Sequence, residues 1–132
     1  MKLVYPAIFY ENEDKSYTVT IPDLPGCVTE GKTFAEALEM AVDAASGWVL
    51  TELEDGNNAP AASDIKSVKT TDQNEFVNLV VLDMDSYAEK YGSRAVRKNC
   101  TIPAWLNTKA EAANINFSAV LQEALQEKLF AQ

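Results

Sequence analysis

Residues 17–38 read YTVTIPDLPGCVTEGKTFAEAL, and this stretch indicates how the first part of the chain folds. In residues 17–21 apolar side chains alternate with threonines, which is the period of a strand with one buried face. The Pro-Asp-Leu-Pro-Gly run at 22–26 predicts a turn, and residues 27–30 are expected to form a short further strand. The stretch therefore contains two strands and, at its end, the first residues of a helix.

The neighbouring residues extend this pattern in both directions. Upstream, residues 3–10 are β-branched and aromatic, and the polar residues 11–16 connect them to the next strand as a hairpin. Downstream, Thr33 and Glu36 have the spacing of a capping box, so the helix should begin there. Apolar residues keep a three-four spacing from 34 to 49, which predicts that one face of this helix packs on the sheet.

A loop and a fourth strand complete the first domain. Residues 55–74 are rich in Asn, Ala, Pro and Ser without any period, so they are expected to be a loop. Residues 76–83 are the most apolar run in the chain and are short enough to be a buried strand. The order strand, strand, strand, helix, strand predicts an α+β fold.

The chain is expected to divide into two domains, 1–92 and 93–132. Residues 85–91 suit a short polar helix, and Gly92-Ser93 comes after it where both charge and pattern change. Residues 1–92 carry six basic and seventeen acidic side chains, a net charge of −11, whereas residues 93–132 carry five basic and three acidic, a net charge of +2. The acidic charge therefore belongs to the first domain.

The last forty residues read as one strand and two helices. In residues 95–103, alternation puts Arg97, Asn99 and Thr101 on one face. Pro103 suits the first turn of a helix over 104–113. After Asn114-Ile115-Asn116, a second amphipathic helix is expected, with Asn116 as its cap.

One strand and two short helices cannot bury their apolar stripes alone, so this domain is expected to form a homodimer with paired strands, a ribbon-helix-helix domain. Its two-stranded ribbon would enter the major groove of DNA, where Arg97, Asn99 and Thr101 could contact base edges. The start of the second helix, at Asn116, Phe117 and Ser118, would bind a phosphate through its backbone N–H groups. The dimer core is expected to comprise Cys100, Ile102, Leu106, Phe117, Val120, Leu121 and Leu125.

Several classes of function are excluded or disfavoured by what the sequence lacks. The absence of histidine removes the usual general base and the usual zinc ligand, and the two cysteines, Cys27 and Cys100, cannot form a metal site alone. We therefore expect no catalytic residues, no metal and no cofactor. The first residues lack the apolar run of a signal peptide, and no segment suits a membrane span, so a cytoplasmic protein is expected.

The sequence resembles the HicB antitoxin family over nearly its whole length. The similarity to the family's N-terminal signature is carried by Tyr5-Pro6-Ala7, by residues 17–19, by the run DLPGCVTEG at 23–31 and by residues 33–38. The C-terminal strand-helix-helix pattern is similar to one of the two DNA-binding domains found in that family.

This resemblance implies a partial RNase H-like fold for residues 1–92, which would bind and inhibit a HicA-type toxin, a small basic mRNA interferase. It implies that the C-terminal domain binds operator DNA of its own toxin-antitoxin operon. Whether this dimer forms part of a tetramer built through the N-terminal domains stays open at this point.

Two other functions remain open at this point. Asp83 and Asp85, at the end of the apolar strand, could be considered as magnesium ligands of a nuclease, although each is more often a turn residue. Alternatively, the C-terminal domain could regulate transcription while residues 1–92 sense a small ligand or oligomerise.

Overall fold

A computed structural model describes residues 1–93 and 95–130 of the chain. Two compact units are separate in it, Met1–Arg94 and Ala95–Gln132. All strands and the helices α1 and α2 belong to the first unit, whereas α3 and α4 belong to the second. No helix in the described ranges is long and apolar enough to cross a lipid bilayer.

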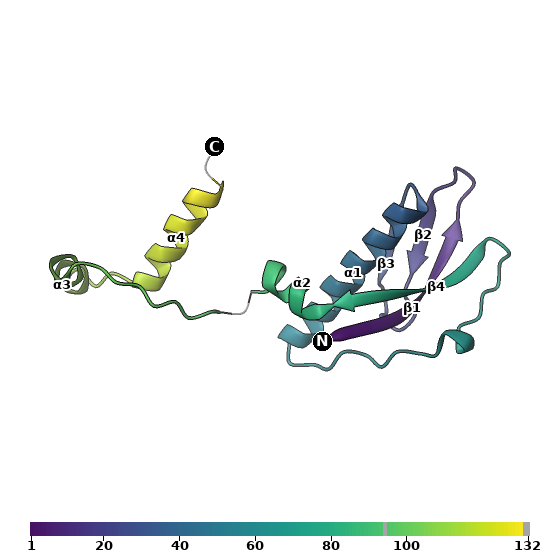
Figure 1. The fold of residues 1–132 in the computed structure, drawn as a ribbon, viewed down its shortest axis with the longest axis horizontal. Coiled ribbons are helices and arrows are strands. Elements are labelled where there is room, and N and C mark those ends of the chain that lie inside the picture. The colour runs from purple at the N-terminus through teal and green to yellow at the C-terminus, as the bar shows by residue number, and fades with distance from the viewer. Residues whose placement is uncertain (94, 131–132) are drawn as a thin grey trace. The chain divides into compact units, whose positions relative to one another are not determined.

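The first unit contains one antiparallel sheet with the strand order β3-β2-β1-β4 (Figure 1). The strands are β1 (Lys2–Glu11), β2 (Tyr17–Thr20), β3 (Val28–Gly31) and β4 (Glu75–Asp83). The long strand β1 lies inside the sheet, where Phe9 is opposite Val19 of β2 and Phe76 of β4. The expected order of strands and helix is confirmed.

Helix α1 (Phe34–Glu54) packs on one face of this sheet (Figure 1). The hydroxyl of Thr33 accepts a hydrogen bond from the Glu36 N–H at 3.1 Å, and the Glu36 carboxylate accepts one from the Lys32 N–H at 3.4 Å. The predicted helix start is therefore confirmed. The helix continues past residue 49 because Leu50 extends its buried stripe.

The core lies between α1 and the sheet. Phe9 stacks on Phe76 with ring centroids 5.4 Å apart, and Phe34 contacts both rings from the first turn of α1. At Gly31 an added Cβ would lie 2.4 Å from the backbone nitrogen of Ala37, so β3 and α1 are in direct backbone contact. The buried apolar residues include Tyr5, Ala7, Phe9, Val19, Ile21, Leu24, Ala37, Ala41, Ala45, Val49, Val80 and Leu82.

Residues 55–74 form the expected loop, interrupted by one short 3-10 helix, η1 (Ile65–Ser67). Two contacts fix the loop to the rest of the unit. The Tyr5 hydroxyl donates to the Pro60 carbonyl at 2.7 Å, and the Ser63 N–H donates to the Asp23 carboxylate at 2.8 Å.

Strand β4 corrects one expectation, since it is not buried on both faces. Val80 and Leu82 face the core, but Val81 between them is 53% exposed. The reason is that β4 is the last strand in the order and α1 covers only one face of the sheet. An apolar run can therefore reflect an edge strand with one uncovered face.

Helix α2 (Met84–Tyr91) begins directly after β4. The Asp83 carboxylate accepts the Ser86 N–H at 3.2 Å and caps the helix. Beyond its end at Gly92, the Ser93 N–H donates to the Glu54 carboxylate of α1 at 3.0 Å. The end of the first unit is therefore attached to the end of α1.

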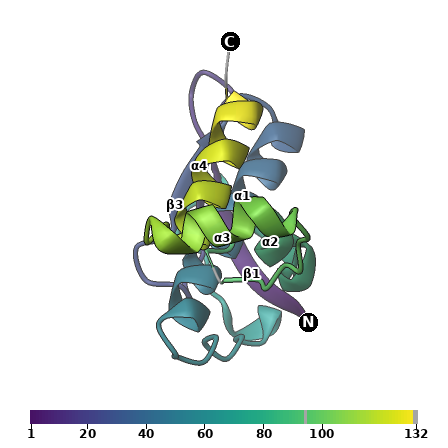
Figure 2. The ribbon, with the colours of Figure 1, turned by 90° about the vertical axis from the view of Figure 1, so that its left-hand side faces the viewer.

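The second unit contains α3 (Ala104–Ala112) and α4 (Phe117–Phe130), whose axes cross steeply (Figure 2). Asn114 has a φ of 54°, a left-handed conformation that asparagine tolerates, and this ends α3. The Asn116 side chain accepts the Ala119 N–H at 3.0 Å, so the predicted cap of α4 is confirmed.

Residues 95–103 do not form the strand that the sequence predicts. The structure gives them no regular secondary structure. A strand is defined by hydrogen bonds to a neighbouring strand, and the partner expected for this segment is the same segment of a second copy. In a single chain the alternation therefore cannot produce a strand.

Candidate interaction sites

The three residues predicted to contact bases, Arg97, Asn99 and Thr101, are all exposed in the segment before α3. Because this segment forms no strand in the single chain, the structure does not assemble them into one face. Their side chains are accessible, and their chemistry is that of base-edge recognition. Their role therefore stays a prediction.

The N-terminus of α4 contains the predicted phosphate-binding residues. The Asn116 side chain is occupied as the cap, while Phe117 and Ser118 are the first residues of the helix. Backbone N–H groups in the first turn of a helix have no acceptor within that helix, and the helix dipole is positive there. This geometry suits an anion, and phosphate binding at this position stays a prediction.

The predicted dimer core is exposed in the single chain. Neither α3 nor α4 contains a buried residue in the described part, and Leu125 is 52% exposed. The seven predicted core residues are all exposed: Cys100, Ile102, Leu106, Phe117, Val120, Leu121 and Leu125. A unit without any buried side chain lacks a core of its own, so its apolar surface needs a partner.

The two tryptophans have different surroundings. Trp48 donates from its indole nitrogen to the Pro25 carbonyl at 3.1 Å and packs against the core, so its role is structural. Trp105 is exposed on α3, with the Lys109 ammonium 5.8 Å from its ring centroid. Cys27 is buried, and burial raises the pKa of its thiol.

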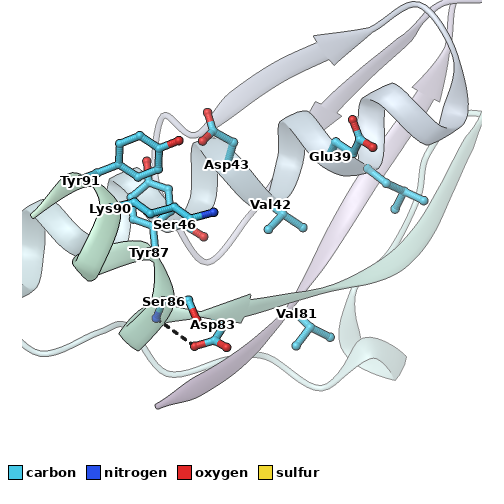
Figure 3. Close-up of a pocket in the computed structure, with 11 residues that line it drawn as sticks. Glu39, Val42, Asp43, Ser46, Val81, Asp83, Ser86, Tyr87, Lys90 and Tyr91 are labelled. Carbon is cyan, nitrogen blue, oxygen red and sulfur yellow. Dashed lines mark hydrogen bonds between the residues drawn. The ribbon is translucent and has the colours of Figure 1, made fainter. Parts of the chain in front are cut away.

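A groove in the first unit is formed by α1, the end of β4 and α2, with a volume of about 520 Å³ (Figure 3). Leu38 and Val42 from α1 supply apolar surface, and Tyr87 and Tyr91 come from α2. The two tyrosine rings contact each other with centroids 4.7 Å apart. The remaining lining residues are Glu39, Asp43, Ser46, Val81, Asp83, Ser86 and Lys90.

The charge of the groove is mainly negative. Glu39, Asp43 and Asp83 contribute three carboxylates, against the single ammonium of Lys90. Burial raises the pKa of the Tyr87 hydroxyl, and the negative charge of Asp43 raises it further. The groove therefore combines aromatic surface with acidic groups, which suits a cationic partner.

Sequence reasoning did not identify this groove. The available signal is the spacing of Glu36, Glu39 and Asp43, which places carboxylates on one face of α1, together with the i, i+4 pair of tyrosines in α2. Neither pattern shows that the two helices lie side by side. Only the tertiary structure brings them together.

The carboxylates considered as magnesium ligands have structural contacts instead. Asp83 caps α2, and Asp85 forms a salt bridge with the amino terminus of Met1. Across the described ranges, no group of three or more potential metal-ligating side chains comes together.

Comparisons with known proteins agree with this architecture. The family described as "HicB_like antitoxin of bacterial toxin-antitoxin system" matches residues 5–125. The chain is 32% identical over 104 residues to an uncharacterized 14.9 kDa protein from the rep-hol intergenic region of Haemophilus phage HP1, over 79% of this chain and 76% of that protein.

Two solved structures are similar over almost the entire chain. One is a toxin-antitoxin complex from Streptococcus pneumoniae, with a TM-score of 0.69, 26% identity, and 97% of this chain and 99% of that chain covered. The other is the antitoxin HicB of Burkholderia pseudomallei, with a TM-score of 0.56, 25% identity, and 96% and 98% covered.

The fold and these similarities define the class of protein as a bacterial antitoxin. Because the family match extends over both units, the chain belongs to the HicB-like antitoxin family. The resemblance observed in the sequence is thereby confirmed.

Proposed function

We propose that this antitoxin neutralises a HicA-type toxin, a small basic mRNA interferase, and represses its own operon by binding operator DNA. Residues 1–92 bind the toxin, and residues 93–132 dimerise and bind DNA. The observation that carries the proposal is the family match over residues 5–125. The similar Streptococcus pneumoniae chain comes from a toxin-antitoxin complex, which supports a toxin as partner.

The distribution of charge supports toxin binding by the first part of the chain and DNA binding by the second. A net charge of −11 on residues 1–92 attracts a basic protein and repels nucleic acid, while the net charge of +2 on residues 93–132 allows contact with phosphates. Binding RNA directly would be unfavourable for the acidic unit. The acidic unit therefore acts on a basic toxin rather than on the toxin's substrate.

The second unit acts as a ribbon-helix-helix homodimer. Pairing residues 95–103 with the same residues of a second copy would give the segment its missing hydrogen bonds, and the exposed stripes of α3 and α4 would be buried at the same time. A tetramer through the first units is compatible with this dimer.

The paired segments would present Arg97, Asn99 and Thr101 to the major groove. The first turn of α4, at Asn116, Phe117 and Ser118, would bind a backbone phosphate and set the position of the dimer on the duplex. Base contacts would then provide sequence specificity.

The first unit has a partial RNase H-like fold in this proposal, but it acts by binding and not by catalysis. The structural contacts of Asp83 and Asp85 weigh against a two-metal nuclease site, and no cofactor is required. A cytoplasmic location is expected for a protein whose partner cleaves mRNA and whose target is DNA.

Two measurements test the proposal. Co-expression with the neighbouring small reading frame should give a complex that co-purifies with this chain. A gel shift on the DNA upstream of the operon should be seen with the wild-type protein and lost in Arg97→Ala. Absence of co-purification would refute toxin binding, and absence of any shift would refute repression.

A further inference from the structure

We propose that the groove between α1, β4 and α2 is the docking surface for the toxin, and that it accepts a lysine- or arginine-bearing segment of that partner. Glu39 and Asp43 would pair with its cationic side chains, and Tyr91 would pack against them. This inference rests on the proposed toxin-binding function and names the surface that performs it.

The shape of the groove fits a protruding segment of a protein. It is an open groove of about 520 Å³ between two helices and a strand end (Figure 3). Leu38 and Val42 provide apolar surface. Grooves that bury the anchor side chains of a partner supply most of the affinity in protein interfaces. The site can therefore hold the stem of a long basic side chain as well as its charge.

Two of the three groove carboxylates, those of Glu39 and Asp43, are available for a partner, whereas Asp83 caps α2. Within residues 1–93 and 95–130 the salt bridges are those of Met1 with Asp85 and of Lys15 with Glu11, so neither Glu39 nor Asp43 is paired there. Lys90 lines the same groove without forming an ion pair in the described ranges. The groove retains an excess of negative charge that a cationic segment would neutralise.

The tyrosines strengthen the case for a protein partner. Tyr91 is 63% exposed and contacts the ring of Tyr87. Tyrosine is enriched among the residues that dominate interface energetics, and its ring attracts the ammonium or guanidinium groups of basic residues. An exposed tyrosine stacked on a half-buried one, beside two carboxylates, therefore favours a basic peptide surface over a small anionic ligand.

A second acidic surface of this unit, the hairpin after β1, lacks these features. Glu11 is paired with Lys15, and the Asp14 carboxylate accepts the Ser16 N–H at 3.0 Å within the turn. Because of these contacts, part of the negative charge of the turn is neutralised locally. None of its residues lines the groove. Glu13 in this turn therefore serves as one of the two control positions in the test.

The test compares two double charge reversals in the full-length protein. Glu39→Lys/Asp43→Lys changes the groove, and Glu13→Lys/Glu30→Lys makes the same change in net charge at exposed positions outside it. Binding of the purified product of the neighbouring small reading frame is measured by calorimetry. The groove variant should bind at least about tenfold more weakly, because like charges would face each other, while the control should change by no more than about twofold.

Two further variants distinguish a loss of binding contacts from misfolding. Glu39→Gln/Asp43→Asn preserves shape while removing charge, and Tyr91→Ala truncates an exposed side chain; both should weaken binding without lowering the melting temperature. Equal weakening by the groove and control reversals would overturn the inference, because only long-range charge would then matter. Unchanged binding by the groove variants would overturn it as well, while the proposed function would stand. If the wild-type protein itself binds no toxin, the function and the inference both fail.

Discussion

At the scale of single residues, Gly31 determines how closely β3 approaches α1. A Cβ at this position would lie 2.4 Å from the Ala37 nitrogen and 2.6 Å from its Cα, both of them backbone atoms that cannot move independently. Gly31→Ala should therefore lower the free energy of unfolding by about 1–3 kcal/mol, as overpacking typically does. Urea denaturation followed by tryptophan fluorescence measures the change.

Gly26 provides the matched control for this prediction. It has a φ of 81°, and an added Cβ would meet no atom within 4 Å. Gly26→Ala should cost only the backbone strain of the left-handed region, on the order of 1 kcal/mol. A Gly31→Ala variant as stable as the wild type would show that the backbone contact between β3 and α1 can relax.

Individual residues also show which features were predictable from sequence. Thr33 and Asn116 were predicted as caps, and each does cap its helix, because capping depends only on residues a few positions away. Glu39 and Tyr91 lie far apart in sequence and line one groove only because α2, which follows β4, packs beside α1. Contacts between distant segments leave no local signal.

At the scale of elements, the link between Glu54 and Ser93 connects the end of α1 to the residues after α2. The Ser93 hydrogen bonds to the Glu54 carboxylate lower the pKa of Glu54 below its ordinary value of 4.5. A group with a lowered pKa in the folded state contributes stability above its unfolded pKa, and this contribution is lost as the pH falls through the folded pKa. Glu54→Gln should therefore reduce the loss of melting temperature between neutral pH and about pH 3.

Calorimetric scans across this pH range measure the effect of the Glu54 substitution. Ser93→Ala removes the hydroxyl donor and keeps the backbone N–H, so it should give a smaller change in the same direction. Identical pH profiles for Glu54→Gln and the wild type would contradict the link.

Two predicted strands show what the periodicity of a sequence does not predict. Residues 76–83 were predicted as a strand, and β4 confirms this, but their apolar character did not distinguish a buried strand from an edge strand. Residues 95–103 have the alternation of a strand but form none in the single chain. Periodicity reports which faces are apolar, whereas the position of the partner strand is set by tertiary or quaternary structure.

At the scale of the whole molecule, the uncovered faces of α3 and α4 predict self-association. Leu121→Asp/Leu125→Asp should convert the proposed dimer to a monomer. The free-energy cost of burying two carboxylates in an apolar interface exceeds the stabilisation that the remaining contacts provide. Sedimentation velocity measures the mass. Gln126→Asp on the same helix adds charge on the side away from the stripe and should leave the dimer intact, so dissociation of this control as well would contradict the assigned interface.

The two units should also be separable in function. Arg97→Ala should weaken operator binding by about tenfold to a hundredfold, the typical value of one bidentate contact to a base, while toxin binding stays unchanged. Arg97→Lys keeps the charge but loses the planar geometry needed for a bidentate contact. If Arg97 reads a base, the lysine variant should lose discrimination against a mutated operator in a competition gel shift, whereas a phosphate contact would leave discrimination intact. Loss of toxin binding in Arg97→Ala would instead show that the acidic unit depends on the second unit for its own partner.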